Sequence, residues 1–354
     1  MKDNQQVLIN GGDIMYNKYL ITGASGFLGR NVIKGLLDKK AEIRALIMRD
    51  DPLEELIPSE VQIIYGNVCD VDSMRDFFEN SDCNTCVIHC AGIVSVASNP
   101  EQRIYDVNVG GTKNIISLCE KNKVGKLIYV SSVHAIPEKP KGIEITEDAC
   151  FLPDLVEGDY AKSKSIATSL VLKAAKRGLD VNVVFPSGII GPGDNGKGSI
   201  TSMLLSFISG KLPLAVKGGY DFVDVRDVAY GIISCSEKGL PGRGYILSGH
   251  YASIKNLLDA AKSAINLKRL VSYLPIWIAK VVAPLYEKWS ILKKRPLFFT
   301  PQSVAVLDSN GKISHEAATK AFGYDPRSIK SSINDTVRWL VKNVLKQKAT
   351  VVVA

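Results

Sequence analysis

The feature that most constrains the fold is a regular alternation of short apolar segments with segments of helical periodicity over the first half of the chain. The apolar segments lie at 18–22, 41–48, 61–66, 86–92, 126–132 and 180–188, and stretches of helical pattern separate most of them. This alternation is typical of a parallel sheet with helices on both faces. The sequence therefore predicts an α/β fold built on a doubly wound parallel sheet.

The pattern changes after about residue 190. A turn-rich segment is followed by a helical segment at 199–211, and residues 220–239 combine a strand with a helix. From Tyr251 onward the chain is mostly helical and basic, with interruptions at Pro275, Pro284 and Pro296. We expect this second region to be smaller, mostly helical and devoted to substrate binding.

Composition narrows the class of protein. With 46% apolar and 23% charged residues, the chain matches an ordinary globular protein. No apolar run approaches the roughly 18–20 residues of a membrane-spanning helix, and the first residues lack the apolar core of a signal peptide. Seven scattered cysteines fit reduced thiols better than a disulfide framework. We therefore expect a cytoplasmic enzyme or binding protein.

Positive charge is concentrated at the end of the chain, because residues 255–354 carry 17 lysines and arginines against 6 acidic residues. Such a segment could attract an anionic substrate, an anionic membrane surface or nucleic acid. No aromatic residues alternate with the basic ones as in a nucleic-acid-binding motif. We therefore favour a solvated basic face and expect no nucleic-acid partner.

Three glycines, Gly23, Gly26 and Gly29, lie between the first predicted strand and the first predicted helix. Glycines at this junction allow a tight turn, close approach of the backbone to a pyrophosphate, and close packing of helix on strand. The helix N-terminus adds free N–H groups and the positive end of its dipole. The segment therefore predicts a dinucleotide-binding site.

The end of the second predicted strand bears on the choice of dinucleotide. A carboxylate there would bind the adenosine ribose of NAD, whereas a cation would favour the 2′-phosphate of NADP. Arg49 follows this strand and favours NADP, although Asp50 and Asp51 come directly after it. A solvated Arg49 is the alternative interpretation.

Tyr160 and Lys164 lie four residues apart at the start of a long predicted helix, so they share one helical face. A phenol with a pKa of ~10 is a poor acid–base catalyst at neutral pH, but a nearby ammonium and an oxidised nicotinamide ring would lower that pKa. Ser132 ends the strand predicted at 126–132, which would place its hydroxyl at the carboxyl edge of the sheet. We predict that Ser132 holds the substrate oxygen while Tyr160 moves the proton.

Taken together, eight motifs resemble the extended short-chain dehydrogenase/reductase family, part of the NAD-dependent epimerase/dehydratase superfamily. The motifs are TGASGFLG (22–29), GNVCD (66–70), HCAG (89–92), NVGGT (108–112), YVSS (129–132), YAKSK (160–164), PSGIIGPGD (186–194) and DFVDVRDVA (221–229). The resemblance implies a Rossmann core at 18–190 and 217–249, and a substrate-binding region at 191–216 and 250–345. We expect residues 1–17 to form a flexible lead and residues 346–354 a tail.

The resemblance also implies roles for individual residues. Ser132, Tyr160 and Lys164 look like the family's catalytic residues, with Asn108 as a proton-relay or structural partner. The implied cofactor contacts are Gly23, Ser25, Gly26, Phe27, Leu28, Gly29, Arg49, Asn67, Val68, Cys90, Ala91, Gly92, Tyr160, Lys164, Pro186 and Ser187. Asn67 departs from the family pattern, which has an aspartate at this position.

Differences from the motifs of individual branches indicate which branch of the family this chain resembles most. The Thr-Asp-Glu set of sugar-nucleotide dehydratases is replaced by Ser-Ser-Val at 131–133, and 135–137 and Ser187 depart from the epimerase pattern. The chain is more similar to the dihydroflavonol-reductase-like and 3β-hydroxysteroid-dehydrogenase-like branches. This similarity implies an NAD(P)-dependent oxidoreductase that acts on a ketone, aldehyde or secondary alcohol of a fairly hydrophobic, steroid- or flavonoid-like substrate.

Two alternatives stay open, namely a nucleotide-sugar epimerase and a non-catalytic regulator that binds the dinucleotide. An epimerase would show no net change in nicotinamide absorbance at steady state, because its cofactor is oxidised and reduced within one cycle. The family also suggests a homodimer formed through residues 112–121 and 160–177.

Several other polar residues could have either a functional role or an ordinary structural one. Cys83, Cys86, His89 and Cys90 have a spacing that invites a zinc site, but in a buried strand Cys86 and His89 would face opposite sides. We therefore expect no metal. His134 could line the substrate pocket or be an ordinary loop histidine.

The apolar and aromatic segment 273–289 is followed by a basic cluster at 293–295. It could form an amphipathic helix that touches a membrane or a lid over an apolar substrate. We favour the lid.

Overall fold

The computed structural model describes residues 16–95, 102–194, 198–212, 214–293 and 299–345. The flexible lead and the tail expected from the sequence lie almost entirely outside these ranges. Among the described helices, none is long and apolar enough to cross a membrane.

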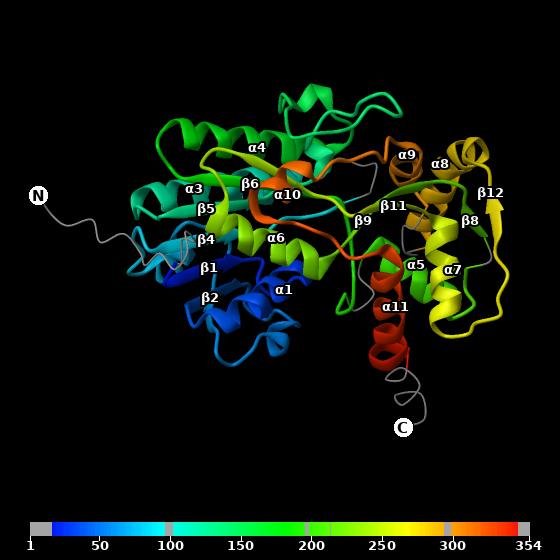
Figure 1. Ribbon diagram of the computed structural model, residues 1–354, viewed down its shortest axis with the longest axis horizontal. Coiled ribbons are helices and arrows are strands. Elements are labelled where there is room, and N and C mark those ends of the chain that lie inside the picture. Colours follow the sequence, from blue (N-terminus) through cyan, green and yellow to red (C-terminus); the bar gives the residue numbers. More distant parts are fainter. Residues whose placement is uncertain (1–15, 96–101, 195–197, 213, 294–298, 346–354) are drawn as a thin grey trace, which may run out of the picture.

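The main sheet has seven strands in the order β10-β6-β5-β4-β1-β2-β3, and all neighbours run parallel (Figure 1). Its strands are β1 (Lys18–Thr22), β2 (Glu42–Ile47), β3 (Gln62–Tyr65), β4 (Thr85–His89), β5 (Lys126–Val130), β6 (Val181–Pro186) and β10 (Gly244–Leu247). The strand order reverses around β1, which pairs with both β2 and β4. This is the point where ligands bind in doubly wound sheets.

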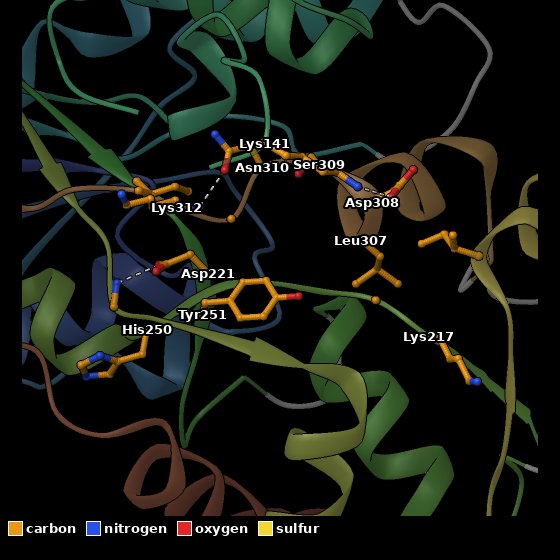
Figure 2. Close-up of a pocket in the computed structure, with 15 residues that line it drawn as sticks. Lys141, Lys217, Asp221, His250, Tyr251, Leu307, Asp308, Ser309, Asn310 and Lys312 are labelled. Atoms are coloured by element: carbon orange, nitrogen blue, oxygen red, sulfur yellow. Dashed lines mark hydrogen bonds and ion pairs between the residues drawn. The ribbon is translucent and has the colours of Figure 1, made fainter. Parts of the chain in front are cut away.

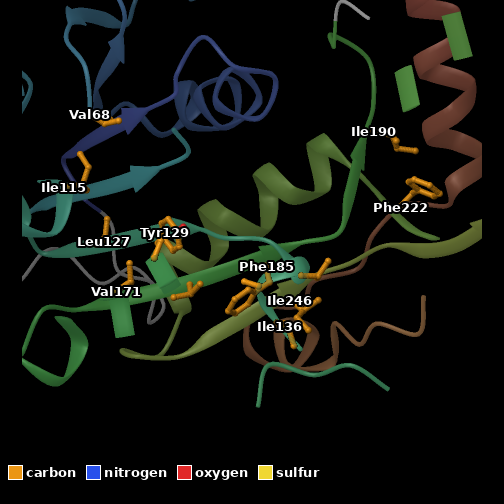
Figure 3. Close-up of a cluster of buried hydrophobic side chains, with 14 of the residues drawn as sticks. Val68, Ile115, Leu127, Tyr129, Ile136, Val171, Phe185, Ile190, Phe222 and Ile246 are labelled. Atoms are coloured by element: carbon orange, nitrogen blue, oxygen red, sulfur yellow. The ribbon is translucent and has the colours of Figure 1, made fainter. Parts of the chain in front are cut away.

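Helices cover both faces of this sheet, as the alternation in the sequence predicts. One face carries α1 (Phe27–Leu36) and α6 (Val225–Lys238), and the other carries α3 (Thr112–Lys121) and α4 (Asp159–Lys176). The core on the α3 and α4 side includes Leu127, Tyr129, Val171 and Phe185, all buried (Figure 3). The fold is therefore an α/β doubly wound parallel sheet.

Whereas α10 (Glu316–Phe322) packs against α6 and β10, most of the remaining elements form a second region at one end of the sheet (Figure 1). It contains a three-stranded sheet of β7 (Gly188–Ile190), β9 (Gly219–Asp224) and β11 (His250–Ser253), and a pair formed by β8 (Leu214–Val216) and β12 (Ser272–Leu274). Its helices are α5 (Ser199–Ile208), α7 (Ile254–Ala264), α8 (Ile276–Leu292), α9 (Pro301–Asp308) and α11 (Ile329–Leu340). β9 is the strand expected at the start of residues 220–239, whereas β8, β11 and β12 are strands that the helical pattern of the sequence does not indicate.

Residues 70–80 have helical periodicity in the sequence, which predicts a helix, and this prediction is wrong. This segment forms two short 3₁₀ turns, Asp72–Met74 and Asp76–Phe78. The Asp70 carboxylate accepts the N–H of Asp72, and the Ser73 hydroxyl donates to the Asp70 carbonyl. Such local side-chain bonds compete with the helical hydrogen bonds of the backbone.

Candidate active site

Ser132 lies just beyond the carboxyl end of β5, at the edge where the parallel strands end. Its hydroxyl oxygen accepts a hydrogen bond from the N–H of His134, 3.2 Å away, and so caps a short 3₁₀ turn at Val133–Ala135. Only 6% of its surface is exposed. The hydroxyl is therefore fixed in place at the rim of the sheet.

Tyr160 and Lys164 lie one turn apart at the start of α4. The neighbouring Ser131 hydroxyl lies 2.7 Å from the hydroxyl of Thr168, which joins the end of β5 to this helix. Burial raises the pKa of Tyr160, and a hydrogen bond with the Ser132 side chain partly offsets the rise. The structure thus brings Ser132 and Tyr160 together.

The Lys164 ammonium is buried and held from two sides. It donates to the Val130 carbonyl at 2.8 Å and lies 5.0 Å from the centre of the Tyr129 ring. Burial lowers the pKa of Lys164 to about 8, so the side chain is still mostly protonated at neutral pH. The lowering of the Tyr160 pKa that we expect from Lys164 is not seen: the pKa is raised by burial of the phenol, and the group that opposes the rise is Ser132.

Asn108 lies in a π-helical turn, Asp106–Gly111, and is almost completely buried. Its amide donates to the Ser163 hydroxyl and to the Ile93 carbonyl, each at 3.0 Å, and its oxygen accepts the Ile93 N–H at 2.8 Å. The Ser163 hydroxyl in turn donates to the Tyr160 carbonyl at 2.7 Å. These bonds place Asn108 as a support for the first turn of α4.

The glycine turn has the shape of a phosphate cradle. Gly23 has φ +65°, and a Cβ added there would lie 2.7 Å from the Ala91 nitrogen. A Cβ on Gly29 would collide with the Gly23 carbonyl and with Ala24. Gly26 caps α1, whose first residue is Phe27. The backbone is therefore packed as tightly as a pyrophosphate site on a helix N-terminus requires.

Two residues outside the predicted set hold this cradle. The Arg30 guanidinium donates to the Ser25 carbonyl and, at 2.7 Å, to the Gly193 carbonyl. The Thr22 hydroxyl accepts the Ala91 N–H at 3.2 Å and lies 2.6 Å from Nδ1 of His89. Neither residue stands out in the sequence, because Arg30 resembles any surface cation of a helix and Thr22 any strand residue.

The other expected cofactor contacts follow the ends of β1, β2, β3, β4 and β6. Three of these expected contacts are exposed, namely Arg49, Asn67 and Gly92. Five are half-buried, namely Ser25, Phe27, Leu28, Cys90 and Ala91. Three are buried, namely Val68, Pro186 and Ser187. Ser25 donates to one Asp51 oxygen at 2.6 Å, and the other Asp51 oxygen accepts the Leu53 N–H at 2.9 Å. The carboxylate of Asp51 is thus already engaged.

Two aromatic rings extend the site beyond Tyr160. His134 stacks on Tyr220 with ring centroids 5.5 Å apart, and its ring meets that of Tyr160 edge-on at 6.3 Å. Burial lowers the pKa of His134 to about 4, so the imidazole is neutral. Tyr220 was missed by the sequence analysis, because it lies in an apolar strand pattern that gives no sign of which side chains face the site.

Asp224 and Asp227 form contacts that hold the fold together. The same is true of His89, which belongs to the cluster with Cys83, Cys86 and Cys90. Asp224 caps α6 and binds Arg226, and Asp227 binds Arg327. Burial lowers the pKa of His89 to about 3, and its ring lies between the hydroxyls of Thr22 and Thr112. Within the described residues no group of three or more histidine, cysteine or acidic side chains could hold a metal ion.

A cavity of about 730 Å³ lies next to this region, between β9, β11 and the segment that follows α9 (Figure 2). Asp221, Lys217 and Tyr251 are among its lining residues, whereas Ser132, Tyr160 and Lys164 are not. Tyr220 and Asp221 are successive strand residues and point to opposite faces of β9. The cavity is therefore separated from the His134 and Tyr160 side by this strand.

Comparisons with known proteins agree with this geometry. The family described as the NAD dependent epimerase/dehydratase family matches residues 19–247. "Sterol demethylase protein B" of Methylococcus capsulatus is 28% identical over 90% of this chain and 97% of its own length. Mouse "3 beta-hydroxysteroid dehydrogenase type 7" is 28% identical over 91% of this chain and 95% of its own length.

A solved structure, "Crystal structure of gox2253", superposes with a TM-score of 0.80 at 25% identity and covers 93% of this chain and 99% of its own. The matched family region includes the glycine turn, Ser132, Tyr160 and Lys164. These findings confirm the predicted fold and the prediction of an enzyme that works with a nicotinamide dinucleotide. The chain belongs to the NAD-dependent epimerase/dehydratase family.

Proposed function

We propose that the protein is a dehydrogenase or reductase that interconverts a secondary alcohol and a ketone on an apolar, ring-containing substrate of the sterol type. The observation that carries the proposal is the placement of Ser132 beside Tyr160 at the carboxyl edge of the sheet, with Lys164 one turn along. The names of the sterol and hydroxysteroid relatives support the substrate class.

In this proposal Tyr160 exchanges the proton of the substrate oxygen, and Ser132 holds that oxygen by a hydrogen bond. When bound, the nicotinamide supplies or accepts the hydride. Lys164 stays charged at neutral pH and stabilises the phenolate form of Tyr160 while it binds the ribose. A resident positive charge is needed because burial alone raises the pKa of Tyr160.

We assign Asn108 as a positioning residue. All of its amide groups are engaged with Ile93 and Ser163, which favours the structural alternative over a proton relay. The chain Asn108–Ser163–Tyr160 fixes the backbone at the start of α4 and, through it, the direction of the phenol. Loss of Asn108 should therefore lower kcat more than it weakens cofactor binding.

The aromatic rings suit a flat apolar substrate. His134 is neutral and half-buried, and Tyr220 stacks on it, so together they present an uncharged aromatic surface next to Tyr160. Such a surface favours contact with fused apolar rings and gives no charged partner for a nucleotide sugar's diphosphate.

For the cofactor we propose NADP. Asp51 already accepts hydrogen bonds from Ser25 and Leu53, so it is a poor acceptor for ribose hydroxyls. Arg49 is exposed and lies over the ring of Tyr65, 5.5 Å from its centre, where it can turn toward a 2′-phosphate. The cradle of Gly23 and Gly29 fits the pyrophosphate of either dinucleotide.

We also propose the division into a dinucleotide-binding core, at 18–190 and 217–249, and a substrate-binding region, at 191–216 and 250–345. The homodimer through α3 and α4 is a further proposal. Analytical ultracentrifugation of variants with charged substitutions on the exposed faces of these helices tests it.

The proposed reaction is tested by mixing purified protein with NADPH or NADH and with a panel that contains a 3-ketosteroid, a flavanone and UDP-glucose. We expect stoichiometric oxidation of NADPH with the steroid. Conversion of UDP-glucose without net change in nicotinamide absorbance would instead assign the protein as an epimerase. Tight cofactor binding with no turnover of any substrate would assign it as a regulator.

A further inference from the structure

Helix α8 (Ile276–Leu292) presents its large apolar side chains to the outside of the protein. Trp277, Val281 and Leu285 follow one another at intervals of four residues, and they are 68%, 69% and 69% exposed. Leu292, on the same side of the helix, is 78% exposed. In Figure 1, α8 lies at the opposite end of the molecule from β1 and β2.

The inner side of α8 carries small or polar residues instead. Ala279 and Ala283 are completely buried against Val216 and Val304, and Ser290 is buried on the same side. This is the reverse of an ordinary surface helix, whose large apolar residues face the core. A contiguous apolar surface of this kind marks a binding site for an apolar partner.

Basic and aromatic residues accompany the apolar stripe, with Lys288 inside it between Leu285 and Leu292, and Lys293 directly after the helix. Lys288 and Lys293 are exposed, and neither forms an ion pair within the described part of the chain. Trp277 and Trp289 lie near the two ends of the helix, and tryptophan side chains favour the boundary between hydrocarbon and lipid headgroups. The last part of the sequence adds a large excess of lysine and arginine.

We propose that α8 docks the protein onto a membrane that contains anionic lipids. The helix would lie in the plane of the interface with Trp277, Val281, Leu285 and Leu292 inserted. Lys288 would extend its long side chain from the stripe to the headgroups, and Lys293 would face them at the end of the helix. This orientation replaces the lid that we expect from the sequence, because a lid would turn these side chains toward the substrate. The proposal does not depend on the reaction proposed above.

The test uses the full-length protein and vesicles of phosphatidylcholine with roughly a third phosphatidylglycerol. In co-sedimentation we expect the W277S/L285S variant to bind at least about tenfold more weakly than the unmodified protein, because two inserted apolar side chains are lost. The control is Y230S/L240S, which removes two other exposed apolar side chains, 53% and 62% exposed, and should bind normally.

Charge and insertion are measured separately. The K288E/K293E variant should lose binding to the anionic vesicles, and pure phosphatidylcholine vesicles should bind the unmodified protein more weakly. With Trp339 replaced by phenylalanine, the two remaining tryptophans both lie in α8, and their fluorescence should shift to the blue when vesicles are added.

Two results would overturn the proposal. One is equal vesicle binding by the unmodified protein and W277S/L285S. The other is no vesicle binding by the unmodified protein, together with dissociation of a dimer in W277S/L285S, which would identify α8 as an interface between two copies of this chain. Activity on a water-soluble substrate should be unchanged in these variants, so failure here is distinguishable from failure of the proposed reaction.

Discussion

The imidazole of His134 lies parallel to the phenol ring of Tyr220, with an angle of 3° between the ring planes. The Tyr220 hydroxyl lies 3.4 Å from Nε2 of His134. Since His134 also contacts the edge of the Tyr160 ring, β9 is linked to the start of α4 through three aromatic side chains. A residue of the small three-stranded sheet thereby helps to shape the site around the proposed proton-transfer group.

Replacing Tyr220 with leucine should raise KM for an apolar ring substrate by about three- to tenfold, because a stacked aromatic pair contributes about 0.5–1.5 kcal/mol. The Tyr220→Phe variant keeps the ring and serves as the control, with KM close to that of the unmodified enzyme. Steady-state kinetics measures both. An unchanged KM in the leucine variant would remove Tyr220 from the substrate site.

The Gly23→Ala variant should lose both stability and cofactor binding. Gly23 has a backbone φ of +65°, at which an alanine would be strained. The added Cβ would also lie 2.7 Å from the Ala91 nitrogen. Gly323 has a φ of +69°, and nothing lies within 4 Å of an added Cβ. The Gly323→Ala variant therefore has the backbone strain without the steric collision. We expect about 1 kcal/mol of destabilisation for Gly323→Ala and clearly more for Gly23→Ala in urea unfolding. Equal losses would show that the close approach to Ala91 is unimportant.

Replacing Arg49 with serine should weaken NADPH binding by about 10- to 100-fold, the effect of losing a charge-assisted hydrogen bond. NADH binding should hardly change, since NADH has no 2′-phosphate. Fluorescence titration of each cofactor measures this, with Arg75→Ser as the control. Arg75 is also exposed to solvent, and it pairs with Asp72. If the variant binds both cofactors more weakly to the same degree, or binds both with unchanged affinity, the NADP proposal is contradicted.

Lys164 should make stability depend on pH in a defined window. Its pKa is about 8 in the folded protein, against ~10.4 in an unfolded chain. Between these values the unfolded state binds more protons, so the stability of the unmodified protein rises with pH. The free energy of unfolding of Lys164→Met relative to the unmodified protein should therefore fall through this window, by up to about 1.4 kcal/mol per pH unit.

Urea unfolding at a series of pH values measures this difference. Lys173→Met is the control, because Lys173 is exposed on the same helix and its removal should give a difference that is constant with pH. A constant difference for Lys164→Met as well would mean that its ammonium is not buried in the folded protein.

The main sheet and its helices were predictable because the strands are apolar and the connecting helices amphipathic, so local pattern and tertiary burial agree. The Gly23, Ser132, Tyr160 and Lys164 positions were predictable for a related reason. Each lies at the start or end of one of these elements, and the parallel sheet brings such ends to one edge.

Other features depend on contacts that a linear pattern does not contain. Residues 70–80 have helical periodicity, yet local side-chain bonds from Asp70 and Ser73 give 3₁₀ turns. Tyr220 reaches the site only because β9 pairs with β7 and β11 in a separate sheet. The apolar residues of α8 show a helix, but which of its sides is buried is decided by packing on α9 and its neighbours.

The most direct test of the central claim is the turnover of Tyr160→Phe, measured beside its affinity for NADPH. The substitution removes one hydroxyl and keeps the ring beside His134. If Tyr160 carries the proton, kcat should fall by about a hundredfold to ten-thousandfold, while NADPH binds with nearly unchanged affinity. A variant that turns over at the normal rate would contradict the assignment of this phenol as the acid–base group.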